Sequence, residues 1–376
     1  MRVGLVVQGL DRPLSGVTRV ALELVRAMEA IGQCELFVLS TSQGKMLEGI
    51  DNERVSYLPG CARVPGLMTL GGPLVAMAAR RLRLDVVHDP VGISPFTLGR
   101  WAGAYRRVLT IHDAIAFRHP EGYSWSNNFL HRRFVPATLR NVDGAITVSQ
   151  HARADLEKYL GLPPEFVSVV PNGVGDSFKP LDPVVARQVA KTYGLNRPYI
   201  LNVGGAQPRK NVDRLLRAYK NLQTSFPDLD LVLVGAGVSR NELLRRAIAG
   251  VRLTDRVRMP GAVAEPDLPA IYSAASLFAF PSLFEGFGLP VLEAMACGTP
   301  VVCSSATSLP EVAGDAALLV DPLDVDAIAS AMDRVLSDQS LASRMRSRGV
   351  DRAAEFTWAR TARETLDAYR RFGSNS

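Results

Sequence analysis

Short apolar runs alternate with segments of helical spacing along almost the whole chain. The runs at residues 3–7, 108–112, 199–203 and 277–280 are rich in aliphatic or aromatic residues, as the buried strands of a parallel sheet are. Loops and helical patterns, such as the one at residues 212–226, separate these runs. The alternation predicts an α/β protein with doubly wound parallel sheets that helices cover on both faces.

The alternation is interrupted once, near residues 180–183, where two prolines enclose a Leu-Asp pair. A chain of 376 residues, 47% of them hydrophobic, is long enough for two domains with a core each. We therefore expect an N-terminal domain over residues 1–180, a second domain over residues 181–356 and a C-terminal helical segment over residues 357–376. Ligands of such sheets lie beyond the carboxyl ends of the strands, and we expect the site in the cleft between the two domains.

Residues 280–300 read as a strand end, a glycine-containing loop and a short helix. Pro290 stands where the first helical residue is expected, and Gly298 closes the helical pattern. The free N–H groups and the positive end of such a helix form a ready anion site. Glu285 and Glu293 frame this site. Because a carboxylate does not help to hold a phosphate, the two glutamates indicate a ligand with hydroxyl groups, such as a sugar.

The basic pair Arg209-Lys210 follows the apolar run at residues 199–203 and precedes a helical pattern. We therefore expect it at the carboxyl end of a strand in the second domain, at the same edge as the loop with Glu285. Two cations beside a helix N-terminus would neutralise a diphosphate. A solvated surface pair is the alternative, and position alone leaves both open.

His112 ends an apolar run of the first domain. A histidine at a strand end can contact a substrate, although a structural histidine is the commoner case. His88-Asp89 and His112-Asp113 could be imagined as metal ligands, but no second pair lies at a diagnostic spacing. We therefore expect no metal site.

Charge and composition limit the partners and the location. The net charge of +6, from 43 basic and 37 acidic residues, does not indicate nucleic acid, but it is compatible with an anionic substrate or membrane surface.

The four cysteines lack CxxC spacing and residues 1–7 already resemble a strand, so we expect reduced thiols, no secretory signal and a cytoplasmic protein. No uncharged apolar run is long enough to span a membrane. Residues 74–84, with three arginines among apolar residues, could lie on a membrane surface or form an ordinary amphipathic helix.

Residues 285–293 (EGFGLPVLE) resemble the two-glutamate signature of the retaining glycosyltransferases of family four, which have the GT-B fold. Residues 203–211 (VGGAQPRKN) resemble the diphosphate loop of that family, and residues 110–113 (TIHD) resemble the strand end that bears its active-site histidine. Further family-like motifs are TVS at 147–149, VPNGV at 170–174, SLPEVAGD at 308–315 and FTWAR at 356–360. The resemblance spans nearly the whole chain. It implies two Rossmann-like domains that face each other across a cleft, with the last helix returning to the first domain.

The resemblance also implies roles for individual side chains. Glu285 would contact hydroxyl groups of the donor sugar, and Glu293 would bind the ribose of the nucleotide. Arg209 and Lys210 would hold the diphosphate and stabilise it as the leaving group. His112 would touch the donor sugar and the reacting centre.

Backbone groups would hold the rest of the donor. Gly16 would lie near the donor phosphates and the acceptor, and backbone around Val263 would hold the base. The phosphates would be bound by the backbone of Phe287, Gly288 and Leu289.

Gly205 lies in the same donor loop and marks a departure from the family. Many members have an arginine at this position, directly after the first glycine of the loop. Arg209 would then do the work of both cations on that side of the diphosphate.

These roles imply a retaining hexosyltransferase that uses a nucleotide-diphosphate sugar as substrate. It would need neither a metal nor another cofactor, because Arg209, Lys210 and the helix N-terminus would balance the negative charge of the leaving diphosphate. The RKN loop together with SLPEVAGD is similar to bacterial mannosyltransferases of polysaccharide assembly. We therefore favour GDP-mannose as donor, and a UDP-linked sugar remains the alternative. We expect a glycan, glycolipid or lipid-linked acceptor, with peripheral contact at the inner membrane face.

Two other classes remain as alternatives. One is a nucleotide-sugar epimerase or a phosphorylase with the same fold. The other is a non-catalytic protein that binds a sugar nucleotide, against which the intact Glu285, Glu293, Lys210 and His112 argue.

Overall fold

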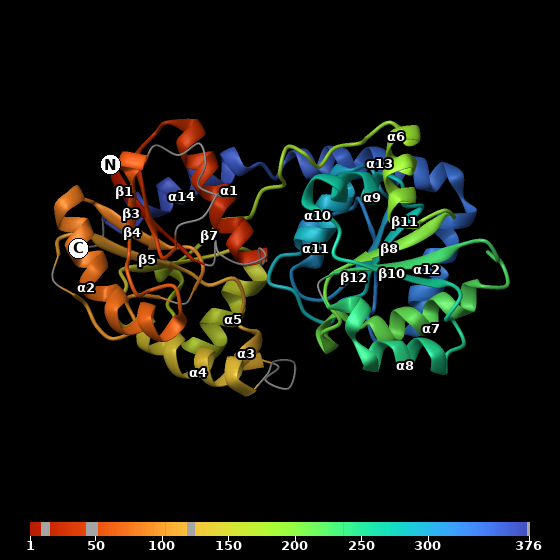
Figure 1. The fold of residues 1–376 in the computed structure, drawn as a ribbon, viewed down its shortest axis with the longest axis horizontal. Coiled ribbons are helices and arrows are strands. Elements are labelled where there is room, and N and C mark those ends of the chain that lie inside the picture. Colours follow the sequence, from red (N-terminus) through yellow and green to blue (C-terminus); the bar gives the residue numbers. More distant parts are fainter. Residues whose placement is uncertain are drawn as a thin grey trace. The chain divides into compact units, whose positions relative to one another are not determined.

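The structure is a computed structural model, and it describes residues 1–8, 16–42, 52–92, 94–101, 103–118, 125–235 and 237–373. The chain divides into two compact units, each with a sheet of its own (Figure 1). The first unit consists of Met1–Gly173 and Trp358–Ser376, and the second of Val174–Thr357.

The expected domain boundary at residue 180 falls inside the second unit. The backbone N–H of Val174 donates to the carbonyl oxygen of Phe356 (2.9 Å), and Val174 also forms a parallel bridge with Thr357. The chain therefore enters and leaves the second unit at paired residues, and the segment that follows, from Trp358 onward, belongs to the first unit.

The described residues of the first unit form one parallel sheet of seven strands. Across the sheet these are β3 (Val55–Tyr57), β2 (Glu35–Ser40), β1 (Arg2–Val7), β4 (Val86–Asp89), β5 (Arg106–Thr110), β6 (Gly144–Thr147) and β7 (Val167–Val169). The order changes direction between β1 and β4, which is the arrangement of a doubly wound sheet.

Helices cover both faces of this sheet. They are α1 (Gly16–Ile31), α2 (Val64–Leu82), α3 (Ile115–Arg118), α4 (Trp125–Leu139), α5 (Gln150–Leu160) and α14 (Trp358–Arg371). One buried cluster joins α2, α4 and α5 to the sheet. On the other face α14, drawn in blue, lies beside α1, drawn in red (Figure 1).

The second unit repeats the plan with a parallel sheet of six strands among its described residues. The strands are β10 (Val257–Gly261), β9 (Asp230–Val234), β8 (Tyr199–Val203), β11 (Leu277–Phe280), β12 (Val301–Ser304) and β13 (Leu318–Val320). The helices are α6 (Pro183–Thr192), α7 (Val212–Leu222), α8 (Glu242–Gly250), α9 (Leu268–Ser273), α10 (Leu289–Ala296), α11 (Leu309–Ala313), α12 (Val325–Ser337) and α13 (Gln339–Ala354). The alternation of strands and helices thus produced the two doubly wound sheets that the sequence predicts.

Two helices differ from the sequence prediction. The segment at residues 180–183, expected as a linker, leads directly into α6. Oδ1 of Asp182 accepts hydrogen bonds from the N–H groups of Val184 and Val185 and so caps the start of this helix. Helix α2 starts at Val64 rather than at residue 74, although Gly71, Gly72 and Pro73 are poor helix formers.

Close packing against the loop at residues 94–101 explains two of the three glycines of α2, Gly71 and Gly72. A Cβ atom on Gly71 would lie 2.9 Å from Cβ of Pro95, and one on Gly72 would overlap Nε1 of Trp101. The loop at residues 94–101 therefore lies directly against the helix, and tertiary contact outweighs the weak helix propensity of these residues.

No helix within the described ranges is both long and apolar enough to cross a membrane.

Candidate active site

In the second unit the strand order changes direction between β8 and β11, which pair in parallel with Ile200 opposite Leu277. Loops from two strands at such a switch point lie together beyond the carboxyl edge of the sheet. The loop after β8 carries Arg209 and Lys210, and the loop after β11 carries Glu285. Chain topology alone thus brings these three side chains to one place.

Glu285 forms ion pairs with both cations. Nζ of Lys210 lies 2.7 Å from Oε1 of Glu285, and a guanidinium nitrogen of Arg209 lies 2.9 Å from Oε2. Lys210 and Glu285 are only 6% and 8% exposed, whereas Arg209 is more open to solvent. Nζ of Lys210 also lies 4.6 Å from the ring centre of Phe280, which adds a cation–π contact.

The charges in this cluster set each other's ionisation. Burial by itself would raise the pKa of the Glu285 carboxyl, but the charges of Lys210 and Arg209 and the hydrogen bond from Lys210 hold that pKa below its usual value. Burial lowers the pKa of Lys210, the Arg209 charge adds to this, and Glu285 opposes it. Two cations against one carboxylate leave one positive charge, which favours an anionic ligand.

Asn211 joins the two loops of the site. It adopts a left-handed backbone conformation (φ 58°), and its Nδ2 atom lies 2.9 Å from the carbonyl oxygen of Pro281 and 2.6 Å from that of Pro322. The N–H of Leu283 donates to the carbonyl oxygen of Arg209 (2.8 Å). The positions of the cations relative to Glu285 are therefore fixed by side-chain and backbone hydrogen bonds.

A third loop, between β12 and α11, supports the Glu285 loop. Oγ of Ser308 lies 2.9 Å from the carbonyl oxygen of Glu285 and 2.8 Å from that of Phe287. The N–H of Glu285 donates to Oγ1 of Thr307 (3.2 Å). The ring of Phe287 packs edge-on against Phe356, with 5.9 Å between centroids. These contacts fix the position of the Glu285 loop.

Helix α10 starts directly after this loop. Gly288 has a φ of 115°, and a Cβ atom there would lie 2.5 Å from Cδ2 of Leu309, so both conformation and space require glycine. Pro290 stands in the first turn and has no N–H, while the N–H of Val291 donates back to Gly288 (3.0 Å). The N–H groups of Gly288 and Leu289 precede these bonds at the positive end of the helix.

Glu293 is buried inside α10 and contacts a tyrosine rather than the cation cluster. Its Oε2 atom accepts a hydrogen bond from the hydroxyl of Tyr272 (2.8 Å). Tyr272 is fully buried, with its ring edge-on to Phe178 and Phe278. The tyrosine therefore fixes one carboxylate oxygen of Glu293.

The other residues predicted for the donor lie at the same edge of this sheet. Gly205 follows β8, and Val263 is half-buried just after β10. A Cβ atom on Gly235 would overlap the carbonyl oxygen of Gly204, so the loops after β8 and β9 are in direct contact. The loops of three adjacent strands thus line this edge of the second unit.

Gly16 and His112 belong to the first unit. Gly16 begins α1 and is exposed. His112 follows β5, and its Nε2 atom lies 2.8 Å from the carbonyl oxygen of Pro90. Burial lowers the pKa of His112 more than the Pro90 hydrogen bond and Asp113 raise it. The neutral ring therefore donates through Nε2, which leaves Nδ1 as an acceptor.

His88 is a structural histidine. Its Nδ1 atom lies 2.6 Å from the hydroxyl oxygen of Tyr369 and its Nε2 atom 2.7 Å from Oγ1 of Thr110. Burial, together with the charge of His112, lowers the pKa of His88 to about 3. Both ring nitrogens are therefore used inside the unit. Across the described ranges, no group of three or more His, Cys, Asp or Glu side chains could hold a metal ion.

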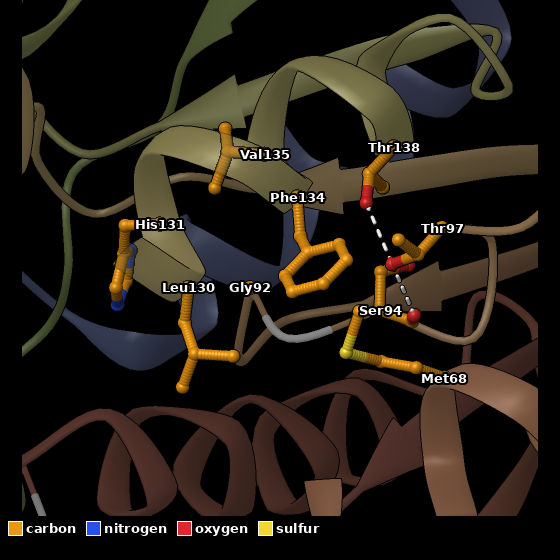
Figure 2. Close-up of a pocket in the computed structure, with 9 residues that line it drawn as sticks. All are labelled: Met68, Gly92, Ser94, Thr97, Leu130, His131, Phe134, Val135 and Thr138. Carbon is orange, nitrogen blue, oxygen red and sulfur yellow. Dashed lines mark hydrogen bonds between the residues drawn. The ribbon is translucent and has the colours of Figure 1, made fainter. Parts of the chain in front are cut away.

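A pocket lies beside the loop after β4 in the first unit and encloses about 310 Å³, its open mouth included. Figure 2 shows the side chains of Met68, Leu130 and Phe134 gathered at this pocket, with Met68 from α2 and the other two from α4. The hydroxyl of Thr97 donates to the carbonyl oxygen of Ser94 (2.8 Å), so one wall carries polar groups. No sequence motif marks these residues.

Several residues that build the site have no role in the sequence prediction. Asn211, Thr307, Ser308 and Tyr272 hold the predicted residues in position through the hydrogen bonds given above. A signal was present for two of them, because Asn211 directly precedes a helical pattern and Ser308 opens the motif SLPEVAGD. Tyr272 lies in an ordinary apolar helix pattern, and only the structure relates it to Glu293.

Known proteins resemble this chain in both sequence and fold. The description "Glycosyltransferase Family 4" matches residues 14–178, and "Glycosyl transferases group 1" matches residues 188–352. The O-antigen chain mannosyltransferase B of Escherichia coli is 30% identical, over 98% of this chain and 100% of that protein. The GDP-mannose-dependent alpha-(1-6)-phosphatidylinositol monomannoside mannosyltransferase of Mycolicibacterium smegmatis is 32% identical, over 74% of this chain and 75% of that protein.

A solved structure extends the likeness to the fold. The sucrose-phosphate synthase from Thermosynechococcus elongatus superimposes with a TM-score of 0.79 over 100% of both chains, at 22% sequence identity. Sequence similarity over the full length, matches in both halves and the two parallel sheets agree with one another. The chain is therefore a glycosyltransferase of family four with the GT-B fold of two Rossmann-like domains.

Proposed function

We propose that this glycosyltransferase moves mannose from GDP-mannose to a glycan or lipid-linked acceptor, with retention of configuration and without a metal or another cofactor. The observation that carries the proposal is the ion-paired cluster of Glu285, Arg209 and Lys210 beside the start of α10. Such a cluster offers positive charge for a diphosphate and a carboxylate for sugar hydroxyls within one hydrogen-bonded unit.

The chemistry follows from the charges. The bond between the sugar C1 and the diphosphate oxygen breaks, and negative charge builds up on the leaving diphosphate. Arg209, Lys210 and the N–H groups before α10 stabilise that charge in place of a metal ion. The acceptor hydroxyl attacks from the face that the diphosphate leaves and gives its proton to the leaving phosphate. Glu285, whose pKa is held low by two cations, acts as an ionised hydrogen-bond acceptor rather than as a nucleophile.

The choice of mannose and GDP rests on the relatives. Two relatives, which are 30% and 32% identical to this chain, are mannosyltransferases, and the second is GDP-mannose-dependent. Their names also support the class of acceptor, because one acts on an O-antigen chain and the other on a phosphatidylinositol mannoside. We infer a cytoplasmic enzyme that meets a lipid-carried glycan at the inner membrane face.

Calorimetric titration with GDP, UDP, ADP and dTDP in the presence of EDTA tests the donor and the metal together. We expect GDP to bind most tightly. The Lys210→Met variant, which keeps a side chain of similar length without the charge, should lose binding. Lys220→Met provides the matched control, since Lys220 is an exposed lysine near the end of α7 and should not matter.

Three outcomes would overturn parts of this proposal. Tight binding of another nucleotide overturns the choice of GDP-mannose. A requirement for a divalent ion overturns metal independence. Unchanged mannose transfer by Glu285→Ala, measured with a radiolabelled donor, removes Glu285 from the reaction.

A further inference from the structure

The first unit contains a long stretch of sequence without negative charge. No acidic residue occurs between Glu53 and Asp85, whereas arginine occurs at positions 54, 63, 80, 81 and 83. The whole chain has nearly as many acidic as basic residues, 37 against 43, so this stretch departs from its average. Most of it is helix α2 and the turn that ends it.

One side of α2 is exposed and apolar. Leu70 is 52% exposed and Met77 is 63% exposed, and the two residues are two helical turns apart on the same side. Arg80 lies one turn beyond Met77 and is also exposed. An apolar stripe that ends in arginines is typical of helices that lie at an interface between water and lipid.

The loop at residues 94–101 widens the apolar stripe. Its Trp101 lies against Gly72 of α2 and is 39% exposed, and its Leu98 is 57% exposed. Tryptophan favours the headgroup level of a membrane because its ring is amphipathic. We call the following residues the α2 surface: Leu70, Met77, Leu98, Trp101, Arg80 and Arg83.

Acidic side chains of the described part of the protein do not neutralise the arginines of the α2 surface. Within the described ranges, neither Arg80 nor Arg83 forms an ion pair with an acidic residue. Asp85, two residues after Arg83, accepts a hydrogen bond from the backbone N–H of Arg2 (2.7 Å), and Asp143 pairs with Arg100. The surface therefore presents positive charge to whatever covers it.

We propose that the α2 surface docks the enzyme on a membrane that contains anionic lipids. The exposed apolar side chains would enter the headgroup region, and the arginines would contact lipid phosphates. A protein partner or a second copy of this chain is less suited, because the surface lacks the acidic residues with which a self-complementary contact would neutralise its arginines. The inference extends the proposed function, since a lipid-carried acceptor would be met at this surface.

Sedimentation with vesicles tests the inference. Wild-type enzyme should bind vesicles of phosphatidylcholine mixed with phosphatidylglycerol, bind vesicles of phosphatidylcholine alone much less, and dissociate as sodium chloride is added. Arg80→Gln combined with Arg83→Asn should weaken binding about 25-fold, since each arginine near an anionic surface contributes about fivefold. Asn suits the left-handed conformation of Arg83 (φ 49°).

A second variant and a control separate lipid contact from general surface effects. Leu70→Ser combined with Met77→Ser should also weaken binding to the mixed vesicles. Leu243→Ser combined with Arg246→Gln removes an exposed leucine (77%) and an arginine from α8, where Glu242 pairs with that arginine. This control should bind the vesicles as the wild type does.

Equal binding to both kinds of vesicle, or binding by the α2 variants as strong as that of the wild type, would overturn the inference. So would a concentration-dependent dimer that the Leu70/Met77 variant abolishes in the absence of lipid, because a second copy would then be the occupant. GDP titration without vesicles is measured in parallel on every variant. If the wild type binds vesicles but not GDP, the proposed donor is contradicted and the docking surface stands. If it binds GDP but not vesicles, only the docking surface is contradicted.

Discussion

At the residue scale, the site depends on buried polar groups that hold one another. Lys210 and Glu285 are both buried, and each relies on the other for its charge. Removing one partner of such a pair leaves an unpaired buried charge, which typically costs about 3–5 kcal/mol. Glu293 is also buried, and one of its carboxylate oxygens accepts a hydrogen bond from the hydroxyl of Tyr272.

Tyr272→Phe is expected to weaken GDP binding roughly tenfold, because a hydrogen bond to a carboxylate is lost and Glu293 is no longer held in position for the ribose. Isothermal titration gives the affinity. Tyr199→Phe is the matched control, since Tyr199 is a buried tyrosine that donates to the carbonyl oxygen of Ile271 (2.6 Å) instead. Similar losses of affinity in both variants would show that Tyr272 acts only through stability.

Asp89→Asn is expected to change how stability depends on pH. Burial raises the pKa of Asp89 to about 7, even though Val91 and Gly92 donate hydrogen bonds to it. Between the unfolded pKa of about 3.9 and pH 7 the folded protein binds more protons, so this carboxyl lowers stability as pH rises. The variant lacks this effect. Its free energy of unfolding should therefore gain on the wild type by roughly 1.4 kcal/mol per pH unit in that window.

Urea unfolding at a series of pH values measures this difference. His88, with a pKa of about 3 and an unfolded value near 6.5, has the opposite effect, because it lowers stability as pH falls through that range. It is present in both proteins, so its contribution cancels in the difference. A difference that does not vary with pH would contradict the raised pKa of Asp89.

At the element scale, close packing outweighs propensity in the middle of α2. The helix runs through Gly71, Gly72 and Pro73 because the loop at residues 94–101 packs directly on it. In the same way α10 begins where Gly288 allows Leu309 to approach, and that approach places the start of the helix against the β12–α11 loop. Both helices are positioned by contacts between segments that are distant in sequence.

Gly72→Ala tests the packing of α2. The new Cβ would overlap the ring of Trp101, and such overpacking typically costs about 1–3 kcal/mol. A Cβ atom on Gly250 in α8 would meet no atom of the described residues within 4 Å, so Gly250→Ala should be neutral or slightly stabilising. Thermal unfolding of both variants gives the comparison, and equal stability of the two would contradict the close contact between α2 and Trp101.

At the scale of the whole molecule, the chain forms two compact units, and each unit has its own parallel sheet. The first unit takes its last helix, α14, from the end of the chain, and Tyr369 of that helix contacts His88 in the middle of the sheet. The stability of the first unit therefore depends on residues almost three hundred positions away in the sequence. The second unit is continuous from Val174 to Thr357.

Tyr369→Phe should lower the stability of the first unit alone by about 1–3 kcal/mol, because Nδ1 of His88 loses its partner inside the core. Hydrogen exchange should show weaker protection of β1, β4 and β5 and unchanged protection of β8 and β11. Tyr219→Phe, whose hydroxyl donates to the carbonyl oxygen of Leu229 in the second unit, should show the reverse pattern. Loss of protection in both units by either variant would contradict this division.

The sequence alone determined the class of fold, because apolar runs that alternate with helical patterns have few stable solutions other than parallel sheets covered by helices. It also placed Arg209, Lys210 and Glu285 in loops after strands, since the strand ends are visible as breaks in the apolar runs. Their meeting in one cluster was decided by the strand order, in which β8 and β11 are neighbours.

Only the tertiary structure decided which groups support the site and where some elements begin. The contacts of Tyr272 with Glu293 and of Ser308 with the Glu285 loop join residues more than twenty positions apart. Local pattern cannot reveal such pairs, because it reflects spacing along one element and not the packing of one element on another. For the same reason the sequence pattern did not show that α2 continues through residues 71–73, where the ring of Trp101 takes the space that a side chain at Gly72 would need.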